Sequence, residues 1–136
     1  MAALLFAVQP GSAQERNLYQ RLGGYDAIAA VVTEFADRLF KDPKLEKLFG
    51  GMSIDTRKRF KQLNIELVCN ATGGPCEYLG RSMPQSHQGS GIRDGDFDQV
   101  AGHLVATLDK FKVPKKEKDE LLAIIGGLRP AIVQAK

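Results

Sequence analysis

Apolar residues recur every three or four positions along most of the chain, and the sequence contains no stretch with the period of two that a half-buried strand needs. The pattern predicts four substantial helices, at residues 26–40, 55–71, 96–111 and about 114–132. Each has an apolar stripe along one face, and such a stripe must be buried against another element. The sequence therefore predicts an all-α domain built from packed helices.

Glycine and proline separate these helices. A short helical turn at 17–22 is followed by two glycines, and a second short turn covers 44–49. Pro114 is favourable in the first turn of the last helix. Pro130 lies near the end of that helix, where we expect it to kink or interrupt the chain.

Residues 75–91 show no periodicity and should form a loop with one turn of helix before His87. A loop of this length inside a compact domain is usually functional, so something must organise it. His87 has the chemistry of an axial haem ligand if a carbonyl or Ser86 orients its second ring nitrogen. Taken alone, however, an exposed loop histidine is the more common interpretation. The other histidine, His103, lies beside an apolar helical stripe, and we expect a structural or surface role for it.

Several short motifs, taken in their order and spacing, resemble the group 1 truncated haemoglobins. They are Leu18-Tyr19-Gln20-Arg21-Leu22-Gly23-Gly24, Gly73-Gly74-Pro75, Tyr78-Leu79-Gly80-Arg81-Ser82-Met83, His87-Gln88-Gly89 and Phe97-Asp98-Gln99-Val100-Ala101-Gly102-His103-Leu104. The resemblance covers about residues 18–135, which is nearly the whole chain. It implies a truncated globin domain over 14–136, with a two-over-two helical sandwich around haem and the long loop as its proximal segment.

The resemblance also implies roles for individual residues. His87 matches the proximal iron ligand of a b-type haem, Phe49 the phenylalanine that stacks on the porphyrin, and Phe60 the distal position over the iron. Asn64, one turn later, matches a distal polar residue that is commonly glutamine in this group. The remaining candidates are Met83, Ile92, Phe97 and Leu104 as haem-lining residues, for which ordinary core packing is an equal alternative, and Arg81 or Lys61 as partners of the propionates.

The distal side departs from the family pattern. The tyrosine typical of the group falls on Ala36, and the distal helix contains no histidine to act as a sixth ligand. Asn64 is then the distal side chain with N–H groups at the right spacing, and we expect a five-coordinate ferrous iron. These differences concern reactivity, not haem binding.

Cys69 and Cys76 bracket the Gly73-Gly74-Pro75 turn, and the sequence has no Cys-x-x-Cys motif. A chain that turns back through two glycines can bring the two Cα atoms within the ~4.4–6.8 Å that a disulfide requires. An exported protein would oxidise such a pair. Two separate buried thiols are the alternative.

Residues 1–13 hold a short apolar run followed by small residues, which resembles the end of a secretory signal without its positive start. A short disordered tail is the alternative. The run is shorter than the ~20 residues needed to span a bilayer. We expect a periplasmic or exported protein, and otherwise a cytoplasmic one. The net charge of +3 is mild and comes with no arginine-rich motif, so we expect no nucleic-acid partner.

The leading functional hypothesis is reversible binding of O2, NO or CO at a haem iron. With an unidentified reductase, the same site could oxidise NO to nitrate. The alternatives are a non-catalytic haem protein for electron transfer or gas sensing, and a haem-free helical interaction domain.

Overall fold

The computed structural model describes residues 16–134, and four long helices dominate this part of the chain. They are α3 (Tyr25–Lys41), α5 (Ile54–Ala71), α7 (Asp94–Lys110) and α8 (Lys115–Gly126). The shorter helices are α2 (Leu18–Arg21), the 3-10 helix η1 (Pro43–Leu45), α4 (Glu46–Phe49), α6 (Met83–His87) and α9 (Arg129–Ile132). The all-α prediction is confirmed, and so is the turn of helix before His87. The leader predicted at residues 1–13 lies outside the described residues.

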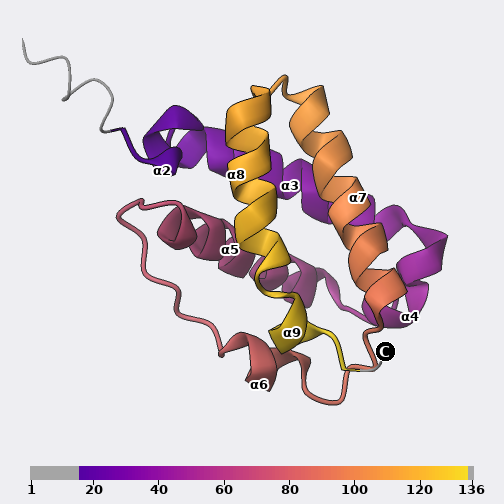
Figure 1. Cartoon of the computed structure of the whole chain (residues 1–136). Coiled ribbons are helices and arrows are strands. Elements are labelled where there is room, and N and C mark those ends of the chain that lie inside the picture. The colour runs from indigo at the N-terminus through magenta and orange to yellow at the C-terminus, as the bar shows by residue number, and fades with distance from the viewer. Residues whose placement is uncertain (1–15, 135–136) are drawn as a thin grey trace, which may run out of the picture.

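The long helices form two pairs. α3 packs against both α5 and α7, and α7 turns back into α8 so that the two run side by side (Figure 1). One pair therefore lies over the other, as a two-over-two sandwich requires. None of the helices within residues 16–134 combines the length and the apolar character needed to cross a membrane.

The long connection between α5 and α6 begins at a turn that is fastened to the N-terminal helix. The Nδ2 group of Asn17 donates a 2.9 Å hydrogen bond to the carbonyl of Gly73, and the backbone N–H of Tyr19 donates to the carbonyl of Thr72. Gly73 has a φ of 97°, and a Cβ there would lie 2.8 Å from the Asn17 side chain. A glycine is therefore needed both for the backbone conformation and for the close approach.

The interruption expected near Pro130 is confirmed, because α8 ends at Gly126 and Pro130 lies in the first turn of a separate helix, where its missing N–H costs nothing. The end predicted for the last helix, at about residue 132, is too late by six residues. The predicted apolar stripes also extend too far, because Ala71 and Phe111 are exposed. Both residues lie at a helix end, where no neighbouring helix covers the stripe.

Candidate haem-binding site

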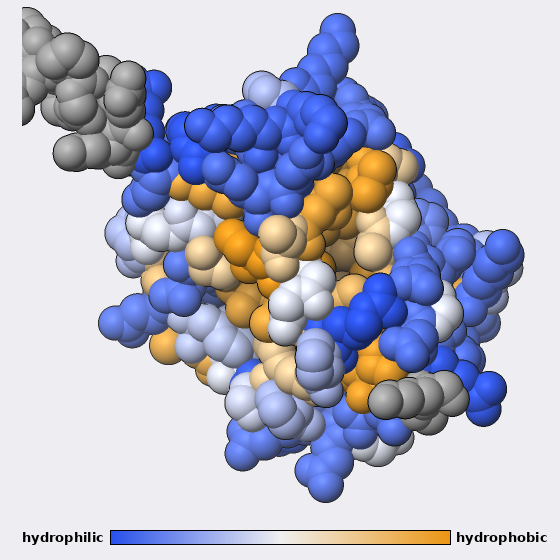
Figure 2. Space-filling view, in the orientation of Figure 1, coloured by the Kyte–Doolittle hydropathy of each residue, from blue (hydrophilic) through white to orange (hydrophobic). Residues whose placement is uncertain are grey.

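The four long helices and α6 enclose a cavity of about 360 Å³. Its wall is almost entirely apolar, and the few polar side chains in it are Asn64, Tyr78, Ser86, His87 and Ser90. In Figure 2 the middle of the visible face is apolar and is hollowed between α7 and α8. A cavity of this size in a small helical domain is the candidate binding site for a cofactor or another small molecule.

His87 is the histidine in the cavity wall, and hydrogen bonds fix its ring. Its Nδ1 lies 2.9 Å from the carbonyl oxygen of Met83 and 3.0 Å from Oγ of Ser86. A carbonyl only accepts hydrogen bonds, so Nδ1 carries the proton. In the neutral ring, Nε2 is then the nitrogen with the free lone pair, which is the form of imidazole that ligates a metal.

The short helix α6 places this imidazole. Ser82 caps the helix by accepting a hydrogen bond from the backbone N–H of Gln85, and Pro84 occupies the first turn. The hydroxyl of Ser86 donates back to the carbonyl of Ser82 at 3.0 Å. Local capping chemistry thus forms the turn of helix that the sequence predicted before His87.

Three phenylalanines, one each from α3, α4 and the N-terminal half of α5, pack edge to face. The ring centroids of Phe40, Phe49 and Phe60 lie 5.5–5.7 Å apart, and Phe49 and Phe60 both line the cavity. Edge-to-face packing fixes each ring against the other two. Two of the three phenylalanines singled out from the sequence, Phe49 and Phe60, are therefore brought together on one part of the wall.

The distal candidates do not all reach the cavity. Asn64 lines it, half-buried, next to Phe60 on α5. Ala36 is fully buried within α3 and lies behind the wall, whereas its neighbours Val32 and Phe35 form part of it. The position that the family resemblance assigns to a tyrosine is therefore filled here by packed apolar atoms.

The aliphatic and aromatic candidates Met83, Ile92, Phe97 and Leu104 all line the cavity. The two candidate propionate partners do not. Lys61 forms a 2.7 Å ion pair with Asp37, and the side chain of Arg81 is exposed.

Tyr78 is a cavity residue to which the sequence assigned no role beyond its place in a motif. Its hydroxyl donates a 2.8 Å hydrogen bond to the carbonyl of Arg81, which bends the connection toward α6. Burial, and secondarily the charge of Glu66, raises the pKa of the Tyr78 phenol. The sequence did contain a signal for this role, because Tyr78 is the aromatic residue in the connection between α5 and α6.

A disulfide ties the end of α5 to this connection. Cys69 and Cys76 are bonded, with their Cα atoms 5.7 Å apart, so the alternative of two separate thiols is wrong. The Nδ2 group of Asn70 donates a further 2.9 Å hydrogen bond to the carbonyl of Cys76. The helix that carries Asn64 and the connection that carries Tyr78 are therefore cross-linked.

These residues fit a haem. The cavity offers an apolar enclosure, aromatic rings for a porphyrin to pack on, and an imidazole whose Nδ1 is already hydrogen-bonded, which leaves Nε2 as the nitrogen for iron. His87 would hold the iron, and Phe49, Phe60 and Phe97 would pack against the ring. His103 has a different task, because its Nε2 lies 2.6 Å from Asp42 Oδ2 and it does not line the cavity.

Comparison with known proteins bears on the same question. The bacterial-like globin family matches residues 17–134. The chain is 38% identical to the group 1 truncated haemoglobin GlbN of Mycolicibacterium paratuberculosis, over 88% of this chain and 86% of that one. It is 29% identical to GlbN of Synechocystis, over 80% of this chain and 89% of that one.

Solved structures agree with the fold. The 2/2 haemoglobin of Synechococcus, in its cyanomet state with covalently attached heme, superposes with a TM-score of 0.78 at 29% identity, covering 87% of this chain and 98% of that one. The Fe(III) form of truncated haemoglobin from Tetrahymena pyriformis gives 0.80 at 24% identity, with the same coverage, and supports the fold alone. Family match, sequence identity and architecture all agree: the chain belongs to the bacterial-like globins and, within them, to the group 1 truncated haemoglobins, which are haem proteins.

Proposed function

We propose that this protein binds O2, NO or CO reversibly at the iron of a b-type haem held by His87. The observation that carries the proposal is the position of His87 in the apolar cavity wall, with its Nδ1 held 2.9 Å from the Met83 carbonyl oxygen. A haem supplies an iron coordination position for a diatomic ligand. The relatives named above are haemoglobins, which also favours this function over a haem-free interaction domain.

The residues that line the cavity would have separate roles in holding the haem and its ligand. His87 holds the iron in one orientation, because Met83 and Ser86 prevent its ring from turning. Phe49 and Phe60 exclude water from one part of the cavity, and Asn64 provides an N–H group there. A dry, weakly polar pocket favours the binding of small neutral ligands, and no side chain of the protein needs to react with them.

The proposal is tested by two histidine variants. We expect His87→Ala to lose normal haem retention and the wild-type spectrum of the ferrous protein with CO. The matched control is His103→Ala, which removes an imidazole bonded to Asp42 outside the cavity wall and should keep both properties. An unchanged haem content and ferrous CO spectrum in His87→Ala would overturn the assignment. A pyridine haemochrome spectrum identifies the haem type.

Oxidation of NO to nitrate is a finer activity of the same site. Such turnover needs O2 and a reductase that restores the ferrous iron after each cycle. Stopped-flow mixing of the oxygenated protein with NO distinguishes it from a non-catalytic role in electron transfer or sensing. Rapid and stoichiometric formation of nitrate supports the enzymatic role, whereas slow reaction supports the non-catalytic one.

We also propose that the protein works in an oxidising compartment, such as the periplasm. The bonded Cys69–Cys76 pair supports this placement, since such bonds persist outside the reducing cytoplasm. Alkylation of free thiols in intact cells, followed by mass spectrometry, tests it. Labelling of both cysteines would contradict the placement.

A further inference from the structure

The C-terminal helix α9 forms part of the cavity wall, although little holds it in place. Leu128 and Ile132 line the cavity, and α9 packs against α6, the helix that carries His87. The helix is four residues long, contains no fully buried residue, and is joined to α8 through Gly127 and Leu128. A short, weakly buried element of this kind belongs to the least stable part of a fold.

Arg129 makes the main polar attachment of this helix. One terminal nitrogen of its guanidinium lies 3.2 Å from Asp94 Oδ1, and the other lies 2.5 Å from Asp98 Oδ1. Its central carbon lies 4.4 Å from the ring centre of Phe97, which is itself a buried residue of the cavity wall. A single side chain thus connects α9 to the first turns of α7.

The rest of the attachment is weaker. The backbone N–H of Gln134 donates a 2.8 Å hydrogen bond to the carbonyl of Ile92. The Arg129 side chain is 36% exposed, and its partners Asp94 and Asp98 are 49% and 66% exposed. Ion pairs at such exposure are weak and are screened by salt, so this attachment can break without unfolding the domain.

We propose that α9 is a strap over the proximal side of the cavity, that it opens to admit and release haem, and that Arg129 is its latch. When the latch opens, α9 can leave α6 by rotation about the residues after Gly126, which uncovers the wall beside His87. Haem then passes through the proximal side, while the disulfide keeps the far end of α5 closed. This inference rests on the proposed haem site at His87.

The test is the rate of haem loss from the loaded protein to an excess of apomyoglobin, followed by absorbance. We expect Arg129→Gln to lose haem about fivefold to tenfold faster, because it removes two half-exposed ion pairs and a cation–π contact. Asp98→Asn should accelerate loss by less, and it should add nothing in the Arg129→Gln background. Amide exchange of Gln134 should rise together with the rate of haem loss.

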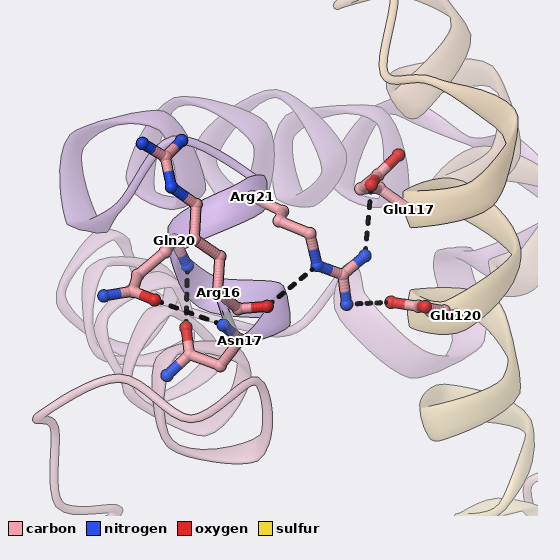
Figure 3. A network of polar contacts seen from close by, with 6 residues as sticks. All are labelled: Arg16, Asn17, Gln20, Arg21, Glu117 and Glu120. Carbon is pink, nitrogen blue, oxygen red and sulfur yellow. Dashed lines mark hydrogen bonds and ion pairs between the residues drawn. The ribbon is translucent and has the colours of Figure 1, made fainter. Parts of the chain in front are cut away.

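The chain offers a matched control at the other end of α8. Arg21 also bridges two carboxylates, Glu117 and Glu120, and fastens α2 to α8 away from α9 (Figure 3). Arg21→Gln likewise removes two ion pairs and should leave the rate of haem loss close to that of the wild type. Equal acceleration in both variants would mean that global stability controls the rate, and would overturn the latch.

Salt provides a second test that needs no variant. Between about 0.01 M and 1 M NaCl the Debye length falls from about 30 Å to 3 Å. Haem loss from the wild type should accelerate over this range, whereas Arg129→Gln should respond little. If Arg129→Gln still binds CO but loses haem at the wild-type rate, the latch is wrong while the proposed function stands. If the wild type takes up no haem, the proposed function fails first.

Discussion

The side-chain amide of Asn64 is tied to its own helix, since its Nδ2 donates a 2.8 Å hydrogen bond to the carbonyl oxygen of Phe60 one turn earlier. Nδ2 carries two hydrogens, so one N–H is held and the other remains for a ligand in the cavity. The orientation of this amide is therefore fixed by helix geometry before any ligand arrives. Among the described residues of α3 and α5 that line the cavity, Asn64 is the one with a side-chain N–H group.

That donor should control O2 release. We expect a fairly fast O2 off-rate in the wild type, and a further rise of up to about tenfold in Asn64→Leu, because one neutral hydrogen bond contributes ~0.5–1.5 kcal/mol. Stopped-flow displacement of O2 measures the rate. Gln62→Leu is the control, because Gln62 lies on the same helix, is exposed and does not line the cavity. An unchanged rate in Asn64→Leu would show that the amide does not reach the ligand.

Restoring a tyrosine at position 36 should slow O2 release. We expect Ala36→Tyr to reduce the off-rate by roughly tenfold through its hydroxyl. Because Ala36 is fully buried behind the wall, the larger ring must displace its neighbours, and we expect a loss of ~1–3 kcal/mol of stability. Ala36→Phe separates the two effects, since it has nearly the same bulk and no donor. Equal off-rates in both variants would contradict the prediction.

The disulfide should contribute to stability. Closing so short a loop contributes about 2–3 kcal/mol on the chain-entropy model. We expect Cys69→Ala/Cys76→Ala to lower the free energy of unfolding by up to that amount, as measured by urea titration without reductant. Adding reductant to the wild type should produce a similar loss and should not affect the variant. Identical unfolding curves for both proteins would show that the bond contributes nothing.

Asp42 should make the protein sensitive to acid. Hydrogen bonds from His103 and Gln99, and from the backbone N–H of Lys44, lower the pKa of its carboxyl group from 3.8 to about 2. A carboxylate with a depressed pKa stabilises the fold fully above its unfolded pKa, and this contribution disappears as the pH falls from about 4 toward 2. Urea titrations at pH 6 and pH 3 should therefore show a smaller difference for Asp42→Asn than for the wild type. Equal differences would assign the acid sensitivity to other carboxylates.

The local pattern of the sequence was enough to predict the helices. Apolar periodicity located α3, α5 and α7 within two residues of their observed ends, because each helix needs a continuous stripe to bury. The turn through Gly73 and Gly74 made a bond between Cys69 and Cys76 possible but left two separate thiols as an alternative, and the structure shows the bond. The motif order indicated the family, since a family resemblance is carried by short segments in a fixed order.

The tertiary structure decided what lies between those segments. Asp42 and His103 are 61 residues apart, and Arg129 and Asp98 are 31 apart, so no local period could pair them. Pro130 indicated a break in the last helix but not its position at Gly126, because a proline can end one helix or begin another. The sequence by itself determined which faces must be buried and, through the order of its motifs, singled out His87 as the candidate iron ligand. The angles at which the helices pack determined the cavity, the burial of Ala36 behind its wall, and the position of the strap, because these depend on contacts between distant residues that periodicity does not encode.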